Sequence, residues 1–255
     1  MRIMGILNLT PDSFHAGSRG DLSVLDAGAD IVDIGACSTR PGSEPVGPAE
    51  EWRRLEPVLR QIAADRPRYP EISIDSYWAE VIARADDLLP GILVNDISCG
   101  DADPAMLPLV AERGLRYVAM HHGKRIHAAR EADDPAADIV AAELAFFEGF
   151  AARAETLGID WILDPGFGFG KTVAQNLELL RSLGCLKRFG REILVGVSRK
   201  SMFFRPLGKG PEDAETLTAT LEAEDRAVRA GATILRVHDV AATRAYFEKR
   251  KSETK

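Results

Sequence analysis

Eight short apolar runs recur along this chain of 255 residues, and their spacing constrains the fold more than any other feature. The runs are largely β-branched and occupy residues 3–7, 31–34, 72–74, 92–94, 115–120, 161–163, 193–197 and 233–237. Helical patterns separate most of them: residues 48–64 begin at Pro48, and residues 136–158 end at Gly158. Short buried strands that alternate with helices indicate parallel β/α units. Eight such units predict a (β/α)8 TIM barrel in a single domain over residues 1–255, with an open doubly wound sheet as the alternative.

Almost every predicted strand ends in a polar residue. These residues are Asn8, Asp75, Asn95, Asp164, Ser198 with Lys200, and Arg236 with His238. In a barrel the carboxyl ends of the strands meet at one mouth, where such enzymes place their chemistry. Each residue alone could be a turn former or a helix cap. Jointly they predict a polar site at the mouth, because such groups are costly to bury without partners.

The stretch DPGFGFGKT, residues 164–172, resembles two phosphate-binding loops without matching either. A P-loop needs a glycine five positions before Gly170, and that position holds Pro165. A dinucleotide fingerprint would need its third glycine where Lys171 stands. The stretch is therefore interpreted as an acidic strand end, Asp164, followed by a flexible turn. The role of Lys171 stays open between a surface lysine and one that faces an anion.

Charge and residue usage exclude several other classes of site. A formal net charge of −7 argues against an extended nucleic-acid or anionic-membrane surface. The three cysteines are far apart and form no C-x-x-C pair, so neither a disulfide framework nor a thiolate zinc site is indicated, and a reducing cytoplasm fits best. His121 and His122 are expected to be hydrogen-bonded loop residues, because no third metal ligand is signalled by spacing. No run approaches the length of a membrane span.

Seven motifs occur in order at the predicted strand ends: GILNLTPDSF, STRPG, SIDSYWAEV, VNDI, DPGFGFGKT, SRKS and ILRVHDV. Together they resemble the dihydropteroate synthase family, a group of pterin-binding TIM barrels, over residues 4–240. The resemblance implies a homodimeric transferase of folate synthesis that is a target of sulfonamides. It would join a dihydropterin methyl diphosphate to 4-aminobenzoate, with release of diphosphate.

The resemblance also implies a role for each motif residue. The pterin would be bound by Asp75, Asn95, Asp164 and Lys200. The diphosphate would be bound by Asn8, Thr39, Arg40, Arg236 and His238. The aminobenzoate would be bound by Ser198, which is expected at a helix N-terminus, and by Phe14, Pro41 and Phe169. A Mg²⁺ ion would be held by the diphosphate oxygens and Asn8, as suits a hard cation with few protein ligands.

Two long loops rich in Gly, Pro, Ser and Asp, at residues 8–20 and 36–48, are expected to act as lids that exclude water. If the first loop extends to Gly20, only residues 21–30 remain for the first crossover helix, which is short for the family. This departure concerns the aminobenzoate site rather than the pterin site. It also motivates the alternative of a catalytically silent barrel that binds pterins or a partner protein. A pterin-dependent methyltransferase is a further alternative, but it would not need the diphosphate motifs.

Overall fold

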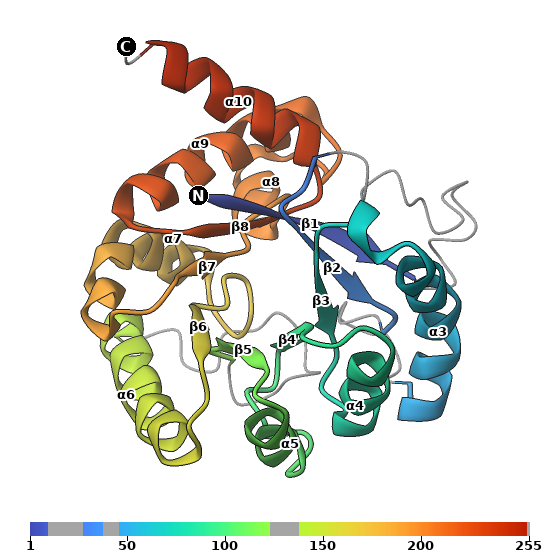
Figure 1. Cartoon of the computed structure of the whole chain (residues 1–255). Coiled ribbons are helices and arrows are strands. Elements are labelled where there is room, and N and C mark those ends of the chain that lie inside the picture. The colour runs from blue at the N-terminus through green and yellow to red at the C-terminus, as the bar shows by residue number, and fades with distance from the viewer. Residues whose placement is uncertain (10–27, 38–45, 123–137, 254–255) are drawn as a thin grey trace.

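A computed structural model describes residues 1–9, 28–37, 46–122 and 138–253, and Figure 1 shows its helices surrounding a ring of strands. The strands are β1 (Arg2–Asn8), β2 (Ile31–Gly35), β3 (Glu71–Asp75), β4 (Leu93–Asp96), β5 (Arg116–Met120), β6 (Trp161–Asp164), β7 (Leu194–Val195) and β8 (Ile234–Val237). The α-helices are α3 (Pro48–Ala64), α4 (Ala79–Leu88), α5 (Met106–Arg113), α6 (Ile139–Leu157), α7 (Val173–Ser182), α8 (Ser201–Leu207), α9 (Ala214–Ala230) and α10 (Val240–Glu253). Two 3₁₀ helices cover Arg66–Arg68 and Leu183–Phe189.

The strands form one parallel sheet that closes into a barrel. Their order is β6-β5-β4-β3-β2-β1-β8-β7. The two ends of this order are joined by a bridge between Leu163 and Ile193, and the Leu163 amide donates to the carbonyl oxygen of Glu192 at 2.9 Å. The predicted TIM barrel is therefore confirmed, and the doubly wound sheet is wrong. The seventh strand has only two residues, fewer than its apolar run suggested.

The two helices expected from the sequence pattern form at the expected places. Helix α3 spans 48–64 and buries one face through Trp52, Leu55, Leu59 and Ile62. Helix α6 ends at Leu157, and Gly158 follows with a φ of 70°, a left-handed conformation that glycine adopts without strain. In the described part of the chain, no helix has the length and apolar character needed to cross a membrane.

The barrel interior has an apolar floor, which we define by one buried residue from each of seven strands. These residues are Met4, Ile31, Leu93, Val118, Ile162, Leu194 and Ile234. A larger cluster fills the space between the strands and the helices. Side chains alternate between the two faces of a strand, so residues two positions beyond the floor also point into the barrel.

The N-terminal ends of the strands carry a group of ion pairs, which we call the basal ion cluster: Arg2, Glu71, Arg116, Asp160 and Glu192. Arg2 contacts Glu71 at 2.8 Å and Glu192 at 3.0 Å. Arg116 pairs with Glu192, with Asp160 at 3.3 Å and with Glu71 at 3.8 Å. The cluster thus links β1, β3 and β5 to the residues that precede β6 and β7.

Candidate active site

The polar residues at the mouth of the barrel occupy the layer directly above the apolar floor. Asp33, Asn95, Asp164 and Arg236 each follow a floor residue by two positions on β2, β4, β6 and β8. Asp75 on β3 follows the buried Ser73 in the same way. Strand alternation therefore directs these five side chains into one cup.

Asp33 is the centre of a hydrogen-bonded network in this cup. Its Oδ2 atom accepts from Asn95 Nδ2 at 2.9 Å and from Arg236 Nε at 2.7 Å. Arg236 Nη2 donates to Asp75 Oδ2 at 2.7 Å. The network brings together three of the predicted site residues, Asp75, Asn95 and Arg236, through a fourth residue that the prediction did not include.

Burial and pairing set the charges of this network. Burial raises the pKa of Asp75 to about 7, and the positive charge of Arg236 acts against that rise. Burial also acts to lower the pKa of Arg236, but the charges of Asp33 and Asp75 outweigh it and raise that pKa above its usual value. Arg236 therefore remains a guanidinium cation between two carboxyl groups.

Asp164 and Lys200 form the opposite side of the cup. Asp164 Oδ1 accepts from the amide of Gly166 at 2.8 Å, and burial raises the pKa of this carboxyl group. Lys200 Nζ donates to the carbonyl oxygen of Phe167 and lies 4.8 Å from the centroid of the Phe169 ring. Burial lowers the pKa of Lys200 to about 7, although the charge of Asp164 opposes the shift.

Ser198 and His238 follow β7 and β8 and contact each other. Ser198 Oγ accepts from the His238 amide at 3.2 Å and lies 3.1 Å from His238 Nδ1. Burial lowers the pKa of His238 to about 4, so the ring is neutral near pH 7. Contrary to expectation, Ser198 does not lie at a helix N-terminus: it lies in a turn, and the cap of α8 is Lys200.

Asn8 ends β1 and is exposed, in register with Gly35 of β2. The other predicted contacts, Phe14, Thr39, Arg40 and Pro41, lie outside the described residues, as does most of both expected lids.

An apolar wall borders the polar cup. Tyr77, Ile97 and Met120 form a buried cluster, against which Cys37 and Phe169 also pack. Polar groups beside an apolar cluster suit a planar heterocycle with a hydrogen-bonding edge.

Comparison with known proteins agrees with this geometry. The family model described as pterin-binding enzyme matches residues 4–238, which is most of the chain. The chain is also 39% identical over 254 residues to the dihydropteroate synthase of Escherichia coli K12, which covers 94% of the chain and 87% of that relative. This chain belongs to the dihydropteroate synthase family.

Other members of the dihydropteroate synthase family match to a similar extent. The Mycobacterium leprae synthase is 38% identical over 262 residues, which cover 95% of this chain and 90% of that relative. The Yersinia pestis synthase, solved with a sulfonamide drug, superposes with a TM-score of 0.88 at 34% identity and covers 99% of this chain and 94% of its own. A Xanthomonas albilineans synthase solved with 4-aminobenzoic acid gives a TM-score of 0.85 at 34% identity, over 99% of this chain and 93% of its own.

One relative is much longer than this chain. A probable bifunctional folylpolyglutamate synthase/dihydropteroate synthase of Haloferax volcanii is 41% identical over 251 residues, and this chain spans only 29% of its length.

The structure of this synthase family member departs from the sequence prediction at two residues, one omitted from the predicted site and one with a different environment. Asp33 was hidden inside an apolar run, although its position two residues beyond Ile31 is a signal that could have found it. Lys171 is neither on the surface nor facing the mouth: its side chain is 1% exposed and lies 3.4 Å from Glu143 on α6. His121 is hydrogen-bonded, as expected, through its Nδ1 to Glu143 at 2.6 Å.

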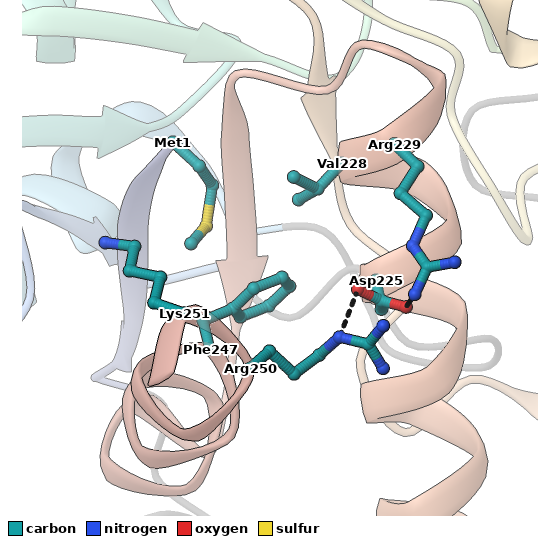
Figure 2. A pocket seen from close by; sticks show the side chains of 7 residues that line it. All are labelled: Met1, Asp225, Val228, Arg229, Phe247, Arg250 and Lys251. Carbon is teal, nitrogen blue, oxygen red and sulfur yellow. Dashed lines mark ion pairs between the residues drawn. The ribbon is translucent and has the colours of Figure 1, made fainter. Parts of the chain in front are cut away.

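A separate hollow of about 890 Å³ lies between α9 and α10, beside Met1 at the N-terminal end of β1 (Figure 2). Its lining includes Val228 and Phe247, and Asp225 pairs there with Arg229 at 2.7 Å and Arg250 at 3.1 Å. The hollow is at the opposite end of the barrel from the polar cup, so it takes no part in the site.

Proposed function

We propose that this member of the dihydropteroate synthase family joins (7,8-dihydropterin-6-yl)methyl diphosphate to 4-aminobenzoate, forming 7,8-dihydropteroate and diphosphate in folate synthesis. The observation that carries the proposal is the layer of Asp33, Asp75, Asn95, Asp164 and Arg236 above the apolar floor, with Lys200 at its edge. Such a layer offers fixed carboxylates, an amide and cations to one planar ligand.

The pterin would lie in the cup with its hydrogen-bonding edge toward this layer. Its amino and ring N–H donors suit the carboxyl groups of Asp75 and Asp164, while its carbonyl and unprotonated ring nitrogens suit Asn95 and Lys200. The apolar wall, including Met120 and Phe169, would cover the faces of the ring. The faces of the pterin ring and its hydrogen-bonding edge would then be held before the reaction.

The leaving diphosphate would lie nearer the rim, with Arg236, His238, Asn8 and, from the loop beyond β2, Thr39 and Arg40. Arg236 uses its Nε on Asp33 and one N–H of Nη2 on Asp75, so among the described contacts Nη1 and the second N–H of Nη2 are left to donate to the diphosphate. Donors fixed in advance around developing negative charge are worth roughly 2.7 to 4 kcal/mol each in enzymes. The C–O bond would break with its electrons leaving on the diphosphate.

The amine of 4-aminobenzoate would then supply its lone pair to the methylene carbon and lose one proton. An arylamine is neutral near pH 7, so the attack does not require a base. Ser198, Phe169, Phe14 and Pro41 would hold the aminobenzoate, and sulfonamides that imitate it would compete for the same contacts.

A Mg²⁺ ion would accompany the diphosphate. The described residues contain no group of three or more potential metal-ligating side chains, whereas exposed Asn8 offers one hard oxygen at the rim. This donor set fits a cation that is held mainly by the substrate's own phosphate oxygens. The cation would neutralise charge on the leaving group, and Asn8 would orient it.

We further expect a homodimer that works in the cytoplasm, in keeping with the resemblance. Sedimentation would test the dimer, and the assay below does not depend on it.

The decisive experiment supplies the purified chain with the pterin diphosphate, Mg²⁺ and 4-aminobenzoate, and measures both diphosphate and dihydropteroate. Equimolar formation of the two products is expected. Asp75→Asn should abolish pterin binding and turnover, because it removes the carboxylate that would accept from the pterin's N–H donors. Asp87→Asn on the exposed end of α4 should change neither. Pterin binding without turnover in the unmodified chain would instead support a catalytically silent barrel.

A further inference from the structure

We propose that Lys171 and Glu143 form a buried clamp that joins the β5 and β6 loops and thereby positions the Phe169–Lys200 side of the pterin cup. The inference rests on the proposed function, and it assigns Lys171 as a positioning residue that does not touch the substrate.

The Lys171 ammonium group is surrounded by acceptors from two loops and one helix. It lies 3.0 Å from the carbonyl oxygen of Gly166, 3.3 Å from that of Phe169 and 3.2 Å from that of His121. Glu143 Oε1 on α6 lies 3.4 Å away. Because both side chains are almost fully buried, each charge depends on the other for compensation.

Glu143 is itself fixed at the β5 end. Its Oε1 atom also contacts His121 Nδ1 at 2.6 Å. The two loops approach closely at this point: a Cβ atom on Gly166 would lie 2.0 Å from the carbonyl oxygen of His121. Gly166 has a φ of 63°, so glycine is required here for both space and conformation.

The loop that Lys171 holds also contacts Lys200. The carbonyl of Phe167, between the two clamped carbonyls of Gly166 and Phe169, accepts from Lys200 Nζ. The Phe169 ring lies 4.8 Å from the same Nζ atom. Displacement of this loop would therefore move Lys200 and the ring that covers the pterin.

The anion side of the mouth is held by different contacts. Arg236 is fixed by Asp33 and Asp75, and His238 by Ser198. None of these hydrogen bonds involves Lys171 or Glu143. Loss of the clamp should consequently reduce pterin affinity more than diphosphate affinity, which distinguishes positioning from a general loss of stability.

The test compares Lys171→Met with the double variant Lys171→Met/Glu143→Gln, which removes both charges and keeps an acceptor for His121. Binding of a pterin without diphosphate and binding of inorganic diphosphate with Mg²⁺ are measured by calorimetry, and thermal unfolding is followed in parallel. Lys209→Met is the control, because it breaks an ion pair with Glu215 in which both side chains are partly exposed.

Both clamp variants are expected to bind the pterin about tenfold or more weakly, since several charge-assisted hydrogen bonds that shape the cup are lost. Diphosphate binding should change by less than about twofold, and the double variant should regain thermal stability without regaining pterin affinity. Recovery of pterin affinity together with stability, or an equal loss for both ligands, would overturn the clamp. An unmodified chain that bound no pterin would overturn the proposed function first, and the clamp with it.

Discussion

Lys200 loses its positive charge more readily than an ordinary lysine does. Burial lowers its pKa to about 7, and the neighbouring positive charges of Arg236 and Lys171 act in the same direction, while Asp164 opposes them. Asp75, on the other side of the cup, has its pKa raised to about 7 by burial. As the pH rises through about 7, Asp75 therefore gains a negative charge while Lys200 loses its positive charge.

We expect pterin affinity to be greatest near pH 7. Below this pH the Asp75 carboxylate is lost by protonation, and above it the Lys200 ammonium is lost by deprotonation. Calorimetric titration of a pterin without diphosphate between about pH 5 and 9 would measure both limbs. Lys200→Met should bind more weakly and lack the alkaline limb, and an unchanged alkaline limb in this variant would assign it to another group.

Asp33 and Lys171 show how far individual residues could be predicted. The polar strand ends that follow the apolar runs are visible in the sequence, and the structure places Asp75, Asn95, Asp164 and Arg236 in one layer. Asp33 could have been found from strand alternation, because it lies two positions beyond Ile31 and its side chain therefore points to the same face of β2. The environment of Lys171 could not, because its burial depends on how α6 brings Glu143 against a loop that is distant in sequence.

At the scale of elements, the N-terminus of α7 fixes the end of the β6 loop, which carries part of the site. Thr172 Oγ1 accepts from the Gln175 amide at 3.1 Å, and Gln175 Oε1 accepts from the Thr172 amide at 2.9 Å. This reciprocal capping box satisfies two amides that the helix leaves unpaired. Asn176 Oδ1 also accepts from the Gly168 amide at 2.7 Å, so the first turn of α7 holds the loop directly.

Thr172→Ala is expected to reduce the free energy of unfolding by about 1 kcal/mol, because one capping acceptor is lost. Urea unfolding would measure the change. Thr218→Ala, at an exposed position beyond the first turn of α9, is the control, and it should be neutral or slightly stabilising, since alanine has the higher helix propensity. Equal effects of the two substitutions would show that the cap contributes nothing.

The elements were easier to predict than their lengths. Helices α3 and α6 follow from amphipathic spacing with Pro48 and Gly158 as boundaries. The short β7 does not, because residues 193–197 are as apolar as a full strand while only Leu194 and Val195 pair as one. Apolar character records burial, whereas strand length depends on the pairing available at the closing seam.

At the scale of the whole molecule, that seam is where the barrel is least supported by backbone pairing. The basal ion cluster lies beside it, with Glu192 accepting from Arg2 and Arg116. Partial burial acts to raise the pKa of Glu192, but the hydrogen bonds from Arg116 and Arg2 outweigh it and lower that pKa. Because this pKa is lower in the folded chain than in the unfolded chain, ionised Glu192 stabilises the fold at any pH above the pKa of the unfolded chain. This stabilisation is lost as the pH falls through the pKa of the folded chain.

Glu192→Gln should therefore destabilise the barrel by about 1 to 2 kcal/mol at pH 7, because two charge-assisted contacts are weakened. The midpoint of thermal unfolding should fall by roughly 2 to 4 °C for each kcal/mol in a protein of this size. The difference from the unmodified chain should shrink as the pH falls through the lowered pKa of Glu192 in the folded state, below which the carboxylate is protonated in both the folded and the unfolded chain. Glu253→Gln, near the end of α10, is the control, and a difference independent of pH would exclude the ionic explanation.

The layered barrel interior has a practical consequence for protein engineering. Three of the groups that would grip the heterocycle, Asp75, Asn95 and Asp164, lie on strands, whereas the segments expected to enclose the second substrate are loops in the sequence. Grafting those segments from a homologous enzyme should alter the choice of amine or inhibitor while the heterocycle is still recognised. Substitutions that reduce inhibitor binding would then fall in the expected lids, while pterin recognition would depend on residues of the strands.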